Sequence, residues 1–286
     1  MKTTLNRSVL IGGAILVVIL VIGLSAPLLG TRDPSQIDPV SRNKRPGAVR
    51  VFTGADGRQI STTYWMGTDS LGRDIYSRVL YGARVSLLVG VSVALLSVMA
   101  GLVIGLLAGY LRWLDGFVMR IMDGLMAVPA ILLAITLVSL STAGLRAVIV
   151  AIVIPEVPRV TRLVRSVVLS IREEPYVEAA TALGARTLPL IVRHVLPNAV
   201  APIIVQATFI CASAIVVEAI LSFLGVGIPP ETPTWGNIMA EGRALFRVFP
   251  HNILFPGIFL AATVLAVNIM GDGLRDSLDP RLRNRL

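Results

Sequence analysis

Long apolar runs separated by short polar segments are the feature that most constrains the fold of this chain. Each run is close to the ~20 residues that a helix needs to cross the hydrocarbon core of a bilayer. The predicted spans are Ser8–Leu29, Val85–Leu111, Phe117–Leu140, Leu145–Leu169, Ala199–Leu224 and Ile253–Met270. Hydrophobic residues make up 55% of the chain and charged residues only 15%, which excludes an ordinary soluble domain. The sequence therefore predicts an all-α polytopic membrane protein with about six transmembrane helices.

Three of these spans have features that modify the prediction. Lys2 and Arg7 precede the first span as they would precede a signal peptide, but the apolar run exceeds the ~7–15 residues usual there. An uncleaved first span is therefore favoured. Pro129 interrupts the third span, and Pro155 and Pro158 are expected to kink the fourth.

The polar stretches divide the chain into four parts. Residues 1–30 form an N-terminal transmembrane helix, and residues 31–80 an extracytoplasmic segment. Residues 81–275 form the transmembrane core, and residues 276–286 a tail on the inner side. Within the extracytoplasmic segment, Val49–Phe52 and Gln59–Tyr64 are expected to pair as a small hairpin around Asp56-Gly57.

The net charge of +9 bears on orientation more than on nucleic-acid binding, because the basic residues cluster at the ends of apolar runs. If both termini are inside, most lysines and arginines beyond the first loop fall on the inner side. The first loop, from Arg32 to Arg84, carries a basic set that argues against this orientation. Long loops follow the charge rule weakly, so we expect both termini on the inner side.

Small residues recur along the second predicted span. Gly101 and Gly105 form a GxxxG pair that Gly109 extends by one more turn. Such a face lets two helix backbones approach closely within a bilayer. We expect it to pack on another helix of the same chain, with a dimer interface as the alternative.

A polar segment, Ile171–Pro197, stands between two of the apolar runs. Pro175 suits the first turn of a helix, and the following residues are good helix formers. Tyr176, Ala180 and Leu183 are expected to share one face of this helix, and Gly184 to end it. A second short helix is predicted from Leu188, closed by Leu196-Pro197. Such a segment is either a docking element for a partner in the aqueous phase or an interfacial loop without one.

The residues of the polar segment resemble a known motif. Glu178-Ala179-Ala180, Gly184 and Leu196-Pro197 have the types and spacing of the EAA loop of ABC importer permeases, with His194 where an aliphatic residue is usual. Three further stretches are similar to the dipeptide/oligopeptide permease family and, within it, to the C-type subunit. These are GTDSLGRDIYSRVLYGARVSL from Gly67, EAILSFLGVGIPPETPTWGNI from Glu218 and NIMGDGLRDSLDPRLR from Asn268. The resemblance covers nearly the whole chain.

The resemblance implies the transmembrane domain of a type I ABC importer in a bacterial plasma (inner) membrane, with both termini cytoplasmic and the first loop outside. The implied partners are a B-type permease subunit, two cytoplasmic ATPase subunits that bind ATP and magnesium, and an extracytoplasmic peptide-binding protein. No cofactor is expected in this chain itself. The residues implied to couple to the ATPase are Tyr176, Glu178, Ala179, Ala180, Leu183, Gly184, Arg186, Leu196 and Pro197.

No enzyme motif accompanies these features. The chain lacks GxxxxGK[ST], HExxH and GxSxG, so it is expected to be a transport subunit whose energy comes from its partners. His194 and His251 fall on opposite sides of the membrane in the predicted topology and cannot share a metal. Cys211 is interpreted as a small buried hydrophobe.

Acidic and amide side chains inside spans are functional candidates, because charge is costly in lipid. Glu218 either faces the translocation path, where it would meet the amino end of a peptide, or belongs to a structural network. Glu156 and Asn268 are candidates of the same kind. For Glu156 an ion pair with Arg159 or Arg162 is the simpler account, and Asp123 is expected to pair with Arg120 one turn away.

The loop from Gly225 to Arg243 is rich in glycine and proline. Trp235 and Asn237 within it are candidates for an outer gate or for contact with a binding protein. Trp235 is equally suited to anchoring the loop at the membrane interface.

Two functional classes compete with the leading prediction of a peptide importer subunit. The same transporter class carries other small solutes, including nickel chelates, glutathione and haem. A secondary transporter acting alone would instead show paired inverted repeats with broken spans, and a membrane-embedded enzyme would need a convergent catalytic set.

Overall fold

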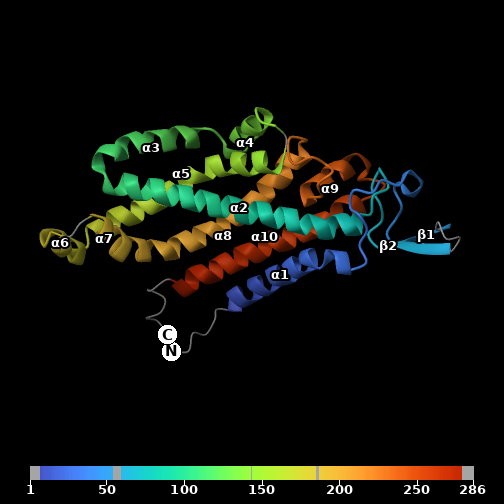
Figure 1. Ribbon diagram of the computed structural model, residues 1–286, viewed down its shortest axis with the longest axis horizontal. Helices are drawn as coiled ribbons and strands as arrows, with labels where there is room; N and C mark the ends of the chain where they lie inside the picture. The colour runs from blue at the N-terminus through green and yellow to red at the C-terminus, as the bar shows by residue number, and fades with distance from the viewer. Residues whose placement is uncertain (1–6, 54–58, 143, 185–186, 279–286) are drawn as a thin grey trace.

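The computed structural model describes residues 7–53, 59–142, 144–184 and 187–278. Five long helices lie side by side and form the bundle in Figure 1. They are α1 (Arg7–Leu24), α2 (Ile75–Tyr110), α5 (Leu145–Arg172), α8 (Leu196–Phe223) and α10 (His251–Leu278). The predicted all-α membrane architecture is confirmed, since the one sheet among the described residues has two short strands.

Not every helix of the bundle is apolar enough to be recognised as a span by composition. Within the described residues, α1, α2, α8 and α10 qualify by length and hydropathy. The 28 residues of α5 would also cross a bilayer, but this helix carries Glu156 and several arginines. These charges find partners inside the chain, as described below.

The third span is two helices, not one interrupted helix. α3 (Arg112–Ala127) and α4 (Ala130–Ser139) meet at an angle of 88°. Val128 between them has an extended backbone, as expected of a residue that precedes a proline, and Pro129 begins α4. The sequence located the break, but not its size.

Two helices exceed their predicted limits by at least two turns. α2 begins at Ile75, ten residues before the predicted start, and α10 continues to Leu278, eight residues beyond the predicted end. Their additional turns contain charged residues, including Arg78 and Arg84 in α2. These charges lower the local hydropathy, so hydropathy alone does not predict the additional turns. α2 therefore starts inside the stretch assigned to the extracytoplasmic segment.

The glycine face of α2 packs against α5. A Cβ atom added at Gly101 would lie 2.4 Å from Cβ of Val160, and one at Gly105 would lie 2.7 Å from Cβ of Val164. Gly109 approaches Val168 in the same way. The prediction that this face packs inside the same chain is therefore confirmed.

α1 is fastened to the outside of the bundle. Gly12 lies against the backbone of α10, where an added Cβ would be 2.5 Å from the carbonyl oxygen of Ala266. At its other end, the guanidinium of Arg84 donates to the carbonyl oxygens of Gly23 and Leu24 at 2.5 and 2.8 Å. Arg84 thus satisfies carbonyls that the end of α1 leaves without helical partners.

One end of the bundle carries the segment that the sequence predicts to be extracytoplasmic. After α1 come two short 3-10 turns, Ala26–Leu28 and Pro39–Ser41, and then the antiparallel strands β1 (Ala48–Thr53) and β2 (Gln59–Tyr64). The predicted hairpin is confirmed in its strands, while its turn at Asp56-Gly57 lies outside the described residues. α9 (Trp235–Gly242), followed by the 3-10 turn Arg243–Leu245, lies at the same end.

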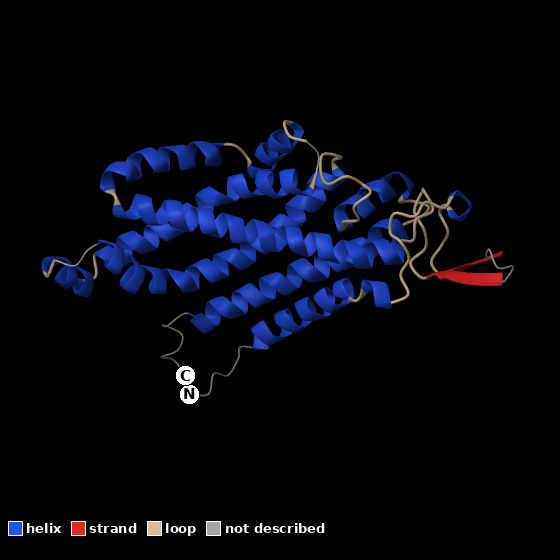
Figure 2. Ribbon diagram, viewed as in Figure 1, coloured by secondary structure: helices blue, strands red, loops and turns tan. Residues whose placement is uncertain are grey.

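The other end of the bundle carries the polar segment. α6 (Pro175–Ala182) and α7 (Thr187–Leu190) lie there, and so do the first residue of α1 and the last of α10 (Figure 1). Figure 2 shows the strands at the opposite extreme of the long axis. The predicted arrangement, with the polar segment and the first and last described residues at one end of the bundle and the hairpin at the other, is thus confirmed.

Candidate functional site

The first half of the polar segment forms a short helix that packs against the bundle. Glu174 precedes α6, and Pro175 occupies its first turn, where the missing N–H costs nothing. Val177 is buried in the main hydrophobic core, and Ala180 packs against the same core. Tyr176 and Leu183 point outward, with Leu183 89% exposed.

The exposed face differs from the predicted one at a single position. Ala180 lies on the inner face of α6 and not beside Tyr176 and Leu183, so that prediction was wrong. Tyr176, Ala179 and Leu183 instead make an outward stripe at spacings of three and four residues, beside exposed Glu178. A large apolar side chain such as that of Leu183, exposed at the end of a bundle, is a natural anchor for a protein partner.

Gly184 ends this helix as expected. Its φ of +83° lies in the left-handed region, which glycine adopts without steric penalty. No atom lies within 4 Å of the position that its Cβ would take, so the constraint is the backbone and not crowding. Arg186, another predicted coupling residue, lies outside the described residues.

Leu196-Pro197 does not close the second helix of the polar segment, contrary to the prediction. α7 continues through a π-helical turn, Ile191–Val195, straight into α8. The amide of Leu196 bonds to the carbonyl oxygen of Ile191 five residues back, and this widening makes room for the ring of Pro197. Any displacement of α7 is therefore passed directly to a helix that crosses the bundle.

The other side of the polar segment is also continuous with the bundle. α5 runs to Arg172, only two residues before the cap of α6. The guanidinium of Arg172 donates to the carbonyl oxygen of Gly109 at 2.9 Å and lies over the ring of Tyr110. Arg165 makes two hydrogen bonds to Asp115 at 2.5 and 2.6 Å. The ends of α2 and α3 are thus tied to α5 where it meets the polar segment.

The ion pairs of α5 differ in part from those predicted. Glu156, almost fully buried, pairs with Arg159 at 3.1 Å, as predicted. Arg162, the other predicted partner of Glu156, instead donates to Asp123 of α3 at 2.5 Å. Asp123 therefore pairs across two helices and not with Arg120 one turn away, because the bend at Pro129 lets α3 lie against α5.

The two remaining intramembrane candidates lie in different surroundings. Glu218 is fully buried, and the hydroxyl of Ser222 donates to its Oε1 at 2.8 Å. α9 approaches α8 closely there, since a Cβ at Gly236 would lie 2.6 Å from Cα of Ala219. This setting favours the structural role of Glu218 over exposure to a path. Asn268 is only partly buried on α10.

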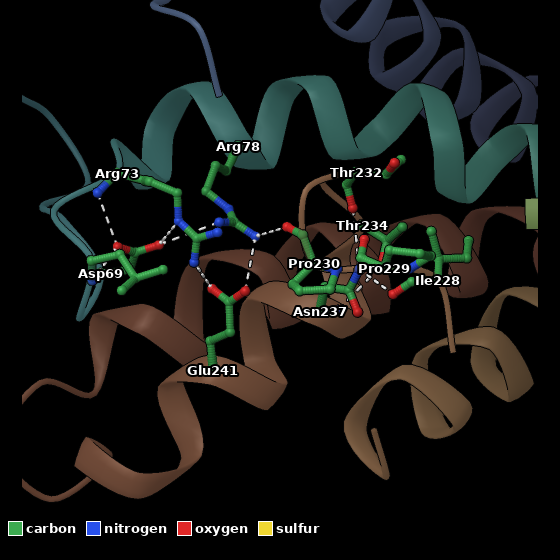
Figure 3. A network of polar contacts seen from close by, with 11 residues as sticks. Asp69, Arg73, Arg78, Ile228, Pro229, Pro230, Thr232, Thr234, Asn237 and Glu241 are labelled. Carbon is green, nitrogen blue, oxygen red and sulfur yellow. Dashed lines mark hydrogen bonds and ion pairs between the residues drawn. The ribbon is translucent and has the colours of Figure 1, made fainter. Parts of the chain in front are cut away.

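Trp235 and Asn237 are both buried under the outer end of the bundle. The indole Nε1 of Trp235 donates to the carbonyl oxygen of Val79 at 3.1 Å, and the residue is 0% exposed. The amide of Asn237 donates to the carbonyl oxygens of Ile228 and Thr232 at 3.0 and 3.1 Å (Figure 3). The two residues hold the loop in place, and neither offers a surface to a partner in this conformation.

A cluster of charges beside Asn237 was not anticipated. Figure 3 shows Arg73 and Arg78 at the head of α2 between Asp69 and Glu241. Arg73 bonds to both carboxylates, at 2.7 Å to Asp69, and Arg78 lies 3.3 Å from Asp69 and 3.4 Å from Glu241. Arg78 also donates to the carbonyl oxygen of Pro230 at 3.3 Å. The sequence signal was limited to the charges themselves, since charged side chains next to apolar helices need partners when they are buried.

Burial has the largest effect on the pKa of Glu241, one of the two carboxylates of this cluster. Desolvation raises the pKa of Glu241 above its ordinary value, and the charges of Arg78 and Arg73 oppose that shift. The two arginines and two carboxylates balance in charge. The cluster therefore links the first loop, α2 and α9 into one unit at the outer end.

An open groove lies at the end of the bundle that carries the polar segment. It measures about 580 Å³ and runs between α5, α8 and α10. Pro197, Gln206 and Arg275 are among its lining residues, with apolar side chains between them. Among the described residues, no group of three or more His, Cys, Asp or Glu side chains is placed to hold a metal ion.

Comparison with known proteins accounts for this arrangement. Residues 101–284 match the family described as the binding-protein-dependent transport system inner membrane component. A probable peptide ABC transporter permease of Sinorhizobium fredii is 50% identical over 97% of this chain and 90% of its own length. The chain belongs to this family.

Other members of this permease family are similar over most of their length. The dipeptide transport system permease DppC of Alkalihalophilus pseudofirmus is 40% identical over 98% of this chain and 88% of its own. The glutathione transport system permease GsiD of Escherichia coli is 45% identical over 78% of this chain and 74% of its own.

A solved structure shares the permease fold. A chain of the inward-facing MetNI methionine ABC transporter matches with a TM-score of 0.59 at 19% identity, over 71% of this chain and 97% of its own. The fold is thus that of a type I importer transmembrane domain. The permease family and the apolar helices place this chain in a bacterial inner membrane as a multi-pass transport subunit.

Proposed function

We propose that this permease forms half of the translocation pathway for dipeptides or oligopeptides in an ATP-driven importer. The similarity to relatives named as peptide and dipeptide permeases supports this substrate class. The glutathione permease among the relatives fits the same chemistry, because glutathione is itself a small peptide. An extracytoplasmic binding protein delivers the solute, and partner subunits bind ATP and magnesium.

The polar segment is the proposed point of energy input. One observation carries this assignment: α6 presents Tyr176, Ala179 and Leu183 to solvent, while its inner face is anchored in the core. α6 follows α5 after two residues, and α7 is continuous with α8 through the π-helical turn. A partner that grips α6 can therefore displace two helices of the bundle together, as a rigid-body mechanism requires.

We further propose a B-type permease subunit as the second half of the pathway, with two ATPase subunits on the α6 side. Apolar side chains of α3 and α4 support this, since Trp113, Phe117 and Leu132 are all more than half exposed. Helices with such faces pack against another subunit or against lipid.

The test of the coupling assignment uses changes on the exposed side of α6. In the complex co-expressed with its ATPases, Leu183→Asp and Glu178→Lys should each lower ATPase association about tenfold or more, because buried anchors dominate interface energies. ATP-dependent peptide uptake should fall in parallel. Co-purification and uptake into proteoliposomes measure the two effects.

Val248→Asp serves as the matched control, because Val248 is a large apolar residue exposed at the opposite end of the bundle. It should leave ATPase association unchanged. Full association and uptake in both α6 variants would contradict the assignment.

A further inference from the structure

The β-hairpin carries an exposed apolar face. Val49 pairs with Thr63 and Val51 with Ser61 across the two strands, so these four residues share one side of the sheet. Val49 is 61% and Val51 58% exposed. Trp65, directly after β2, is 68% exposed. We call Val49, Val51 and Trp65 the hairpin face.

The opposite side of the hairpin is fixed by polar contacts. Tyr64 is almost fully buried, and its hydroxyl donates to Oγ of Ser41 at 3.0 Å. Arg50 pairs with Asp38, and Arg32 donates to the hydroxyl of Thr62. A two-stranded hairpin alone is marginally stable in water, so these contacts hold this one in a defined orientation.

The base of the hairpin is joined to the head of α2. The amide of Lys44 donates to Oγ1 of Thr68 at 2.8 Å, and the amide of Thr68 donates back to the carbonyl oxygen of Lys44 at 3.1 Å. The next residue, Asp69, belongs to the buried charge cluster with Arg73 and Arg78. The base of the hairpin is therefore fastened to the residues that lead into α2.

The position of the hairpin favours the aqueous phase over the lipid. Figures 1 and 2 show it projecting past the ends of the helices along the long axis of the bundle. An apolar face held rigidly in water indicates a protein partner. Exposed Arg42, Lys44 and Arg45 near its base give the surrounding surface a positive charge, which an acidic surface complements.

We propose that the hairpin face is a docking surface for the extracytoplasmic solute-binding protein, which meets it with apolar side chains rimmed by acidic residues. This inference rests on the proposed function. It moves the contact away from Trp235 and Asn237, which are buried. Docking at the hairpin face also places the binding protein on an element fastened to α2, the helix that packs along α5 toward the polar segment.

The experiment compares wild-type complex with a variant that carries Val49→Ser, Val51→Ser and Trp65→Ala. Complexes with all subunits are placed in phosphatidylcholine nanodiscs, and purified cognate binding protein is titrated while ATP hydrolysis is measured. The concentration that gives half-maximal stimulation should rise about tenfold or more in the variant, since few central residues carry most interface energy. Hydrolysis without binding protein should not change.

Leu224→Ser is the control, because it removes a similarly exposed apolar side chain at the end of α8, outside the hairpin and its charged surround. It should leave the half-maximal concentration unchanged. A triple variant that assembles and responds like the wild type overturns the inference. A wild-type complex that no binding protein stimulates would instead overturn the proposed function itself.

A photoreactive benzoylphenylalanine at position Val51 provides a second readout that does not depend on the triple variant. Irradiation with labelled, solute-loaded binding protein should give a covalent adduct between the two chains. An excess of unlabelled binding protein should lower the yield of this adduct. Adducts only with phospholipid or with the second permease subunit would overturn the inference.

Discussion

Single charged residues decide how the outer end of the bundle is held. Asp69, Arg73, Arg78 and Glu241 form a buried cluster of balanced charge, and loss of any one of these side chains would leave an unbalanced buried charge. Charged residues inside apolar runs, such as Glu156 and Glu218, are evident from the sequence. The cluster was not predicted, because the pairing of Arg73 and Arg78 with Glu241 depends on the tertiary fold.

Asp74 gives a test at this scale. Its carboxylate accepts from the amide of Ser77 at 3.0 Å and caps the start of α2. Asp74→Ala should lower stability by about 0.5–2 kcal/mol, because it leaves the first turn uncapped, whereas Asp74→Asn keeps an acceptor and should cost less. Thermal unfolding of the purified complex in detergent measures the difference. An alanine variant as stable as the wild type would show that the cap contributes nothing.

The same residue predicts a pH dependence. Burial raises the pKa of Asp74 above 3.8, so the folded chain binds this proton more tightly than the unfolded chain. The contribution of this bound proton to the free energy of unfolding is fully present below pH 3.8 and is lost as pH rises through the folded-state pKa. Asp74→Asn should remove that part of the slope when unfolding midpoints are compared across this range.

Among the elements, helix packing was the most predictable from sequence. The spacing of Gly101, Gly105 and Gly109 indicated a close helix contact, and α5 supplies it through Val160, Val164 and Val168. The polar segment was predicted correctly as helix, glycine and helix. Its junction with α8 was predicted wrongly. A Leu-Pro pair usually indicates a helix end, but here a π-helical turn accommodates the proline ring and the helix continues.

The α2–α5 contact predicts a contrast between two glycines. Gly101→Ala should destabilise the chain by about 1–3 kcal/mol, because the new Cβ would lie 2.4 Å from Cβ of Val160 in a packed contact. Gly116→Ala in α3 has no atom within 4 Å of its new Cβ, and it should be neutral or stabilising by up to about 1 kcal/mol. Unfolding midpoints of the two variants test this. Equal effects would show that the close approach is not tight in the membrane.

At the scale of the whole molecule, one continuous structure joins the two ends of the bundle. The hairpin is fastened to the head of α2, α2 packs along α5, and α5 leads into the polar segment. Arg172 ties the far end of α2 to α5 again. Events at a docking surface outside and at an ATPase inside can thus be linked through rigid elements, which is the physical requirement for coupling two distant sites.

The sequence predicted the order and sides of these parts but not their connection. Apolar runs predicted about six spans and located most of the long helices, and the family resemblance resolved the conflict that charge left at the first loop. The 88° bend at Pro129 and the burial of Trp235 both depend on packing between distant segments, which a single sequence read by hydropathy does not encode.

The most direct test of the account labels α6 at its outward residue. Leu183→Cys is introduced together with Cys211→Ser, which removes the only native cysteine. The permease is labelled with a bulky maleimide before the ATPase subunits are added, and this variant alone should then support no ATP-driven peptide uptake in proteoliposomes. ATPase subunits bound before the maleimide is added should protect the thiol. Unchanged uptake after complete labelling would contradict the claim that energy enters the permease through the polar segment.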